Sequence, residues 1–113
     1  MERERDNLKV REIIRDCIKS ILAKYGVEVK EIILFGSRAR GNYKKDSDWD
    51  CFVIVDKELS REKKREIVAK IRMSLARLSI PTDIIIRSTK SIENQKNDVG
   101  YLTYYVLREG VRL

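Results

Sequence analysis

The sequence predicts a small α/β domain in which one mixed β-sheet is covered by helices. Short runs rich in β-branched and aromatic residues alternate with helical patterns, and the length of 113 residues allows one compact domain. Hydrophobic residues make up 42% of the chain, enough for a folded core rather than a disordered segment. We therefore expect a single domain over residues 1–113, with a sheet between helices.

Apolar residues that recur every three or four positions predict the helices. We expect three of them, at residues 8–25, about 60–78 and about 91–108. Gly26 ends the first, Ser60 and Ser91 are suited to cap the other two, and Gly100 interrupts the last.

The strands are predicted by β-branched and aromatic runs next to turn residues. We expect them at residues 27–35, 48–55 and 82–86, followed at the end of the chain by a short tail over 111–113. The third run follows Pro81 and is apolar at successive positions, as expected for a strand with helices against the sheet. The resulting order is α-β-β-α-β-α.

Composition excludes several functions. The chain has no histidine, so a Ser-His-Asp or Cys-His nucleophile and a His-ligated metal are excluded. Two cysteines suit neither a four-thiolate zinc site nor a disulfide scaffold. Lys and Arg number 25 against 18 Asp and Glu, and the net charge of +7 favours a nucleotide, a nucleic acid or an acidic protein as ligand.

The location expected from the sequence is the cytoplasm. No apolar run approaches the roughly 20 residues that cross a bilayer. The charged N-terminus is not followed by the apolar segment of a signal peptide. We expect no membrane association.

A glycine-serine turn is the first of three candidate site features. Gly36-Ser37 directly follows the first predicted strand, where glycine permits a tight turn and close approach to a ligand. The Ser37 hydroxyl can donate to a phosphate, and Arg38 and Arg40 can make forked hydrogen bonds to its oxygens. Taken alone, the segment is better explained as an ordinary turn with solvated arginines, because Gly-Ser turns are common.

Two carboxylates begin the second predicted strand. If Asp48 and Asp50 both lie in the strand, they share one face, while Trp49 and Cys51 face the other way and pack in the core. Two acids so placed repel one another unless a divalent cation joins them, and their hard oxygens suit Mg²⁺ or Mn²⁺. The alternative is that Asp48 is a turn residue and only Asp50 lies in the strand.

A third acid, Asp83, opens the last predicted strand. A carboxylate there can simply be leaving a turn. If this strand neighbours that of Asp50, Asp83 becomes a third metal ligand and a general base for an attacking hydroxyl.

Together, Gly36-Ser37 and Asp48-Trp49-Asp50 resemble the signature of the DNA polymerase β-like nucleotidyltransferases. The fuller string, Gly-Ser-Arg-Ala-Arg-Gly followed by Asp-Ser-Asp-Trp-Asp, is similar to that of the minimal nucleotidyltransferase (MNT) family. The signature covers 15 residues, from Gly36 to Asp50, and Asp83 extends the match. The resemblance implies the polymerase β-like fold and a metal-dependent nucleotidyltransferase that uses ATP.

The resemblance also implies roles for individual residues. Asp48, Asp50 and Asp83 would be the catalytic residues and the ligands of two Mg²⁺ ions, with Mn²⁺ as a substitute. Nucleotide binding would fall to the turn residues, which are Gly36, Ser37, Arg38 and Arg40.

Many MNT proteins are paired with a HEPN-domain toxin. The implied function is that of an antitoxin that transfers AMP from ATP to this partner within a hetero-oligomer. Two alternatives stay open, namely a non-catalytic antitoxin that masks its partner by contact and a nucleic-acid-binding subunit. Two further groups are expected to have structural rather than ligand-binding roles. We expect the tyrosines of the last helix to pack in the core, with one or two contacts to a partner, and the basic run 61–65 to form a solvated helix face.

Overall fold

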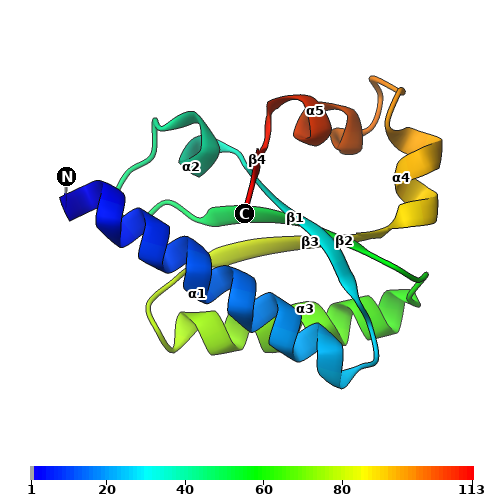
Figure 1. Cartoon of the computed structure of the whole chain (residues 1–113), viewed down its shortest axis with the longest axis horizontal. Coiled ribbons are helices and arrows are strands. Elements are labelled where there is room, and N and C mark those ends of the chain that lie inside the picture. Colours follow the sequence, from blue (N-terminus) through cyan, green and yellow to red (C-terminus); the bar gives the residue numbers. More distant parts are fainter. Residues whose placement is uncertain (1) are drawn as a thin grey trace.

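The computed structural model describes residues 2–113. Nine helices and strands follow one another in this range, and their bounds are α1 Glu2–Lys24, β1 Val29–Phe35, α2 Ser37–Arg40, β2 Trp49–Val55, α3 Arg61–Ala76, β3 Thr82–Ser88, α4 Thr89–Gln95, α5 Leu102–Glu109 and β4 Val111–Arg112. Figure 1 shows one sheet crossing the molecule, with helices on either side of it. The predicted fold class, a mixed sheet covered by helices, is confirmed.

The sheet has four strands in the order β3-β2-β1-β4. β1 pairs with β2 in antiparallel fashion, and β4 adds to the other side of β1, also antiparallel. β2 and β3 are parallel and are joined by α3, the crossover helix that parallel neighbours require. β3 therefore lies at one edge of the sheet.

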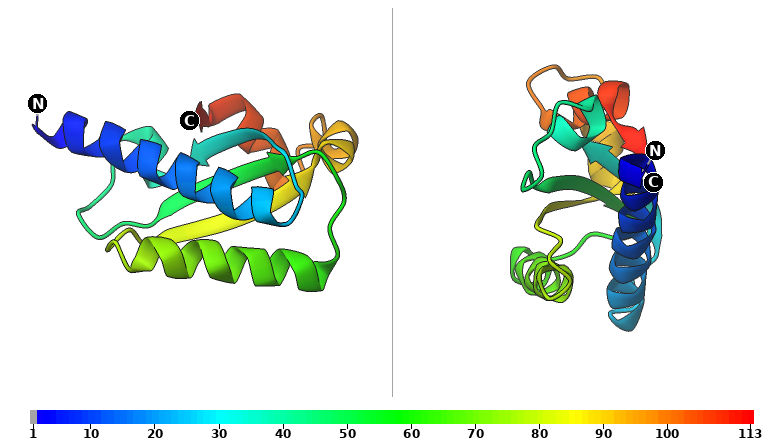
Figure 2. Two further views of the ribbon diagram at one scale, coloured as in Figure 1. Left: turned by 60° about the horizontal axis from the view of Figure 1, so that its bottom comes forward. Right: turned by 90° about the vertical axis from the view of Figure 1, so that its left-hand side faces the viewer.

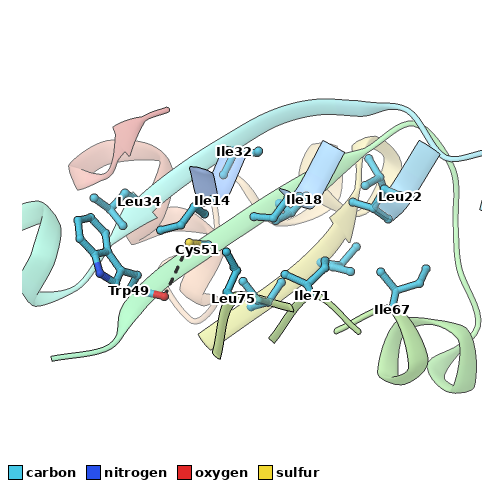
Figure 3. Packing of buried hydrophobic residues seen from close by; sticks show 14 of the residues in the cluster. Ile14, Ile18, Leu22, Ile32, Leu34, Trp49, Cys51, Ile67, Ile71 and Leu75 are labelled. Atoms are coloured by element: carbon cyan, nitrogen blue, oxygen red, sulfur yellow. Dashed lines mark hydrogen bonds between the residues drawn. The ribbon is translucent and has the colours of Figure 1, made fainter. Parts of the chain in front are cut away.

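α1 and α3 cover one face of the sheet and enclose the larger core cluster. Strand residues alternate between faces, so every second residue of β2 faces these helices. Figure 3 shows the contact, in which the apolar side chains of α1 and α3 meet those of β1 and β2; the labelled residues are Ile14, Ile18, Leu22, Ile32, Leu34, Trp49, Cys51, Ile67, Ile71 and Leu75. Trp49 is only 4% exposed, and Trp49 and Cys51 both belong to this core as predicted.

α4 and α5 cover part of the opposite face. Ile92 of α4 and Val106 of α5 pack on Ile33, Phe52 and Ile54 of the sheet. The views of Figure 2 show these C-terminal helices on the side of the sheet away from α1 and α3. The side chain of Asp50 lies on this second face, because it alternates with Trp49 and Cys51.

The local signals explain most element boundaries. Ser60 caps α3 as predicted, since its side chain accepts a hydrogen bond from the Lys63 amide at 3.0 Å. The predicted cap at Ser91 is wrong. β3 extends to Ser88, and the Ser88 hydroxyl accepts a hydrogen bond from the Ser91 amide and caps α4.

The predicted last helix, at about residues 91–108 with an interruption at Gly100, is two separate helices, α4 and α5. Two further elements also differ from the prediction. The polar segment after Gly36 begins with the single turn α2, and the C-terminal tail pairs with β1 as β4, where Val111 is the partner of Leu34. Neither is long enough to show a hydrophobic period. No helix within residues 2–113 is long and apolar enough to cross a membrane.

Candidate functional site

Asp50 and Asp83 lie side by side on neighbouring strands. They are register partners in the parallel pair of β2 and β3, each at the second residue of its strand. Since paired residues of neighbouring strands point to the same face, both carboxylates face the side covered by α4 and α5. Asp50 is half-buried and Asp83 is exposed. The predicted adjacency of these two acids is therefore present in the fold.

Asp48 lies just outside the sheet. β2 begins at Trp49, and Asp48 is the exposed residue before it. The alternative in which only Asp50 belongs to the strand is thus the one observed. Among the side chains of residues 7–113, no group of three or more Asp, Glu, Cys or His residues is placed to hold a metal ion. The charge of Asp48 nevertheless acts on Asp50.

The turn after β1 closes directly over Asp50. Phe35, the last residue of β1, is the register partner of Asp50, so the next residue passes beside its carboxylate. Gly36 has a φ of 74°, a backbone conformation that residues with a β-carbon rarely adopt. A β-carbon at position 36 would lie 2.2 Å from Oδ2 of Asp50. Glycine is needed here for its conformation and for its lack of a side chain.

The environment of Asp50 disfavours its charged form. Burial raises the pKa of Asp50 above the ordinary value, and the negative charges of Asp83 and Asp48 raise it further. The guanidinium of Arg40 acts in the opposite direction. Asp50 is therefore a carboxylate that a nearby cation would stabilise.

Cys51, next to Asp50 in β2, is an inert core residue. Burial, with the negative charges of Asp50 and Asp83, raises the pKa of the Cys51 thiol to about 12. Its Sγ lies 3.7 Å from the Trp49 carbonyl oxygen, to which it donates (Figure 3). A thiol in this state is not a nucleophile at neutral pH.

Arg38 and Arg40 have different environments, a division that the sequence did not reveal. Arg38 is 8% exposed, and its guanidinium donates to the carbonyls of Lys45 and Ser47 at 2.9–3.2 Å. It also lies over the rings of Tyr43 and Trp49, 4.3 and 4.5 Å from their centroids. Arg38 thereby fixes the loop that leads to Asp48.

Arg40 instead is exposed and lines a pocket beside the turn. The pocket has a volume of about 310 Å³ and lies between the β1–α2 turn and α5, lined by Phe35, Gly36, Ala39, Arg40, Leu102, Tyr105, Val106 and Glu109. The α5 residues of this pocket were missed by sequence reasoning, which assigned the tyrosines to the core and to partner contacts. Tyr105 is 48% exposed, unlike a core tyrosine. Only the fold brings it near Gly36.

Comparison with known proteins gives concordant results. The family model of the nucleotidyltransferase domain matches residues 12–105. Two proteins of Methanocaldococcus jannaschii that carry the name "putative protein adenylyltransferase" are similar to this chain. One is 35% identical over 79 residues, which is 70% of this chain and 76% of that protein. The other is 42% identical over 43 residues, or 38% and 43% of the two chains.

More distant matches agree with the fold. The CCA-adding enzyme of the same organism is 42% identical over 69 residues, which is 60% of this chain and 15% of the enzyme. Two solved structures have a TM-score of 0.54. One, described as a toxin-antitoxin with AMP-PNP, is 21% identical and covers 86% of this chain and 69% of its own. The other, a mutant of the toxin-antitoxin MntA-HpeT, is 20% identical and covers 94% and 70%.

The family match includes the turn at Gly36, both strand-borne acids and the first half of α5. The similar structures have the same fold. The two relatives named as adenylyltransferases agree with the nucleotidyltransferase activity of the matched domain family. The protein therefore belongs to the nucleotidyltransferase domain family, with the polymerase β-like fold that its glycine-serine and paired aspartate motif predicts.

Proposed function

We propose that this nucleotidyltransferase transfers AMP from ATP to a hydroxyl group of a partner protein and acts as the antitoxin of a HEPN-type toxin in the cytoplasm. The observation that carries the proposal is the placement of Asp50 and Asp83 as register partners under the Gly36 turn. The relatives named as protein adenylyltransferases favour a protein acceptor. The similarity to toxin-antitoxin structures, one with AMP-PNP, favours an ATP-dependent antitoxin.

The donor set fits Mg²⁺. Carboxylate oxygens are the ligands that this ion prefers, and a bound cation would favour the charged form of Asp50, whose pKa is raised by burial first and then by the charges of Asp83 and Asp48. Asp50 and Asp83 would hold the ions. Asp48 is exposed, so its side chain can turn toward them when a cation binds. Two bound ions would supply neutralisation of the triphosphate charge.

The chain's own groups would orient the reactants. The backbone at Gly36 and the Ser37 hydroxyl bind the β- and γ-phosphates, and Arg40 supplies positive charge beside them. The acceptor oxygen attacks the α-phosphorus in line, the bond to the β-phosphate oxygen breaks, and pyrophosphate leaves. Asp83, the exposed member of the Asp50–Asp83 pair, takes the proton of the attacking hydroxyl.

The pocket between the β1–α2 turn and α5 is suited to the adenosine end of the nucleotide. Its volume of about 310 Å³ is at the small end of ligand sites. Tyr105 offers an exposed aromatic ring for stacking on a base, and Glu109 offers an acceptor for an exocyclic amino group. Its wall at Gly36 places the sugar and phosphates toward Asp50.

A second candidate function is masking of the toxin by contact alone. Two observations favour it. In the part of the chain that the structure describes, the three acids are not gathered into one metal-ligand group. In addition, apolar side chains are exposed around the start of α5, namely Val99, Tyr101, Leu102 and Tyr105. Such a patch is suited to a partner surface.

The test is transfer of label from α-³²P-ATP to the protein encoded beside this one, co-expressed and purified with it. We expect labelling of the partner in Mg²⁺ and none when chelator is in excess. Asp50→Asn should abolish labelling without changing the elution of the complex. Equal labelling by wild type and Asp50→Asn would overturn the proposed site, and silencing of the partner without any label would favour contact alone.

A further inference from the structure

The outer edge of β3 forms one wall of a groove. β3 is the edge strand, with β2 as its neighbour in the sheet. Four consecutive residues, Ile84–Arg87, line a groove of about 420 Å³ together with α3. Because successive strand residues face opposite sides, four in a row can line one groove only along the strand's edge. We call this the β3 edge groove. Figure 1 labels α3 and β3, the two elements that line it.

The β3 edge groove is strongly basic. Five cationic side chains and no acidic one line it, and they are Arg61, Lys64, Arg65, Arg72 and Arg87. None of the five forms an ion pair with another side chain in the range 7–113. Lys64 acts electrostatically on Glu58, whose carboxylate already accepts hydrogen bonds from Ser88 and Ser91. The basic run of α3, which is solvent-exposed at Arg61 and Arg65 as predicted, therefore continues across the groove to Arg87 of β3.

The remaining lining favours a polypeptide over a nucleic acid. Between the cations, the walls are aliphatic, made by Val68 and Ala69 of α3 and by Ile84–Ile86. No aromatic side chain lines the groove, whereas single-stranded nucleic acids bind by stacking bases on aromatic rings. An edge strand offers a row of backbone N–H and C=O groups, which an extended peptide can pair with.

We propose that the β3 edge groove binds an extended, acidic segment of a partner protein, which adds to the sheet as a strand beside β3. Backbone pairing with the edge supplies part of the affinity. Carboxylates of the segment meet the five cations, and its alternate apolar side chains contact Val68 and Ile85.

The groove leads to the candidate active site. Ile84, at one end of its lining, directly follows Asp83, and strand residues rise only about 3.3 Å each. A segment paired with β3 would therefore bring the residues beyond its end to the carboxylates. That the segment belongs to the AMP acceptor rests on the proposed function, but its binding does not, and it is measured without ATP.

Fluorescence anisotropy provides the test, with the full-length protein and three labelled probes. The first is a peptide of alternating glutamate and valine, the second its lysine counterpart, and the third a single-stranded RNA oligonucleotide. We expect saturable binding of the acidic peptide that weakens as salt rises, and little binding of the other two. If the basic residues only prevent aggregation through the exposed strand edge, the acidic peptide should not bind. Absence of peptide binding would overturn the proposal, and so would preferential binding of the RNA.

A charge-reversal pair locates the site. Lys64→Glu with Arg65→Glu changes the groove, whereas Lys9→Glu with Lys19→Glu makes the same change on exposed positions of α1. We expect the groove pair to weaken peptide binding by about tenfold or more and the α1 pair to leave it within about twofold. Equal losses would show that only net charge matters and would overturn the assignment. Thermal unfolding serves as the folding control for both pairs.

Backbone pairing is tested with a peptide methylated at alternate amide nitrogens. It keeps every side chain but cannot pair along one of its edges. We expect weaker binding when the methylated edge faces β3, together with slower hydrogen exchange of β3 amides in the complex with the unmodified peptide. Equal affinity of both methylated registers would exclude strand addition. A protein that binds the peptide but transfers no AMP would leave this proposal intact and remove the proposed function.

Discussion

The α-carbon of Gly36 lies against the carboxylate of Asp50, so closely that a methyl group at position 36 would sit 2.2 Å from Asp50 Oδ2 and 3.1 Å from its Cγ. The glycine of the turn and the acid of β2 are thus one packing unit. Their relationship explains why both residue types occur together at this spacing.

We expect Gly36→Ala to destabilise the fold for two reasons. The φ of 74° strains any residue with a β-carbon, which costs about 1–2 kcal/mol, and the new methyl collides with Asp50. Thermal unfolding measures the sum. In the double variant Gly36→Ala/Asp50→Ala, the shortened side chain at position 50 lacks the colliding carboxylate. This variant should recover part of the stability that Gly36→Ala loses.

Gly41→Ala is the matched control. Gly41 has a φ of 84°, but a β-carbon there would meet nothing within 4 Å. This variant therefore measures strain without collision, and Gly36→Ala should unfold at a distinctly lower temperature. If the two variants are equally stable, the contact with Asp50 has no energetic weight. Loss of ATP binding in Gly36→Ala alone would further tie the turn to the nucleotide.

Asp50→Asn should stabilise the protein in a pH-dependent way. The pKa of Asp50 is raised in the fold, by burial first and then by Asp83 and Asp48, so the folded state binds more protons than the unfolded state. Stability from this group is then lost as pH rises from the ordinary aspartate pKa through the raised one. Asn carries no charge and avoids this loss.

Urea unfolding across the acidic range and up to pH 8 measures the difference. The gain of Asp50→Asn over wild type should be near zero below the ordinary aspartate pKa and should reach a plateau near neutral pH. Asp46→Asn, which removes one carboxylate at an exposed loop position, is the control for the change in net charge. A gain that grows toward low pH would contradict the raised pKa.

The periodic parts of the fold were predictable from the sequence, and the non-periodic parts were not. Runs of apolar residues with a clear period predicted β1, β2, β3, α1 and α3, because each buries one or both faces. Asp50 and Asp83 are paired only because their strands are neighbours in the sheet. The sequence pattern does not determine which strands are neighbours, so it predicted this pairing only on the condition that they are. Topology supplied the answer.

The side chains of the site were less predictable than its backbone. Arg38 and Arg40 are equivalent in the sequence, yet one is buried under the loop and the other lines a pocket. The difference arises from carbonyls of Lys45 and Ser47, whose positions depend on the whole loop. The start of β2 could not be placed either, since a residue before a strand alternates like one within it.

Arg38 and Arg40 should therefore separate stability from ligand binding. Arg38→Gln removes the donors to the Lys45 and Ser47 carbonyls and a cation stacked on two rings, which should cost about 1–3 kcal/mol. Arg40→Gln should change stability by less than about 0.5 kcal/mol but weaken ATP binding. Urea unfolding and calorimetry with ATP measure the two effects. Equal stability of both variants would contradict the structural role of Arg38.

Asp83→Asn should stop transfer while leaving the fold intact. Asp83 is exposed, so its loss costs little stability, but removing the proposed base should slow AMP transfer by about a hundredfold or more. Because the charge of Asp83 raises the pKa of Asp50, that pKa should fall in the variant, which carboxyl NMR can follow. If the pKa of Asp50 falls but AMP transfer is unchanged, Asp83 lies close to Asp50 as described but is not the base. Silencing of the toxin by an inactive Asp83→Asn would make contact the mechanism of the antitoxin.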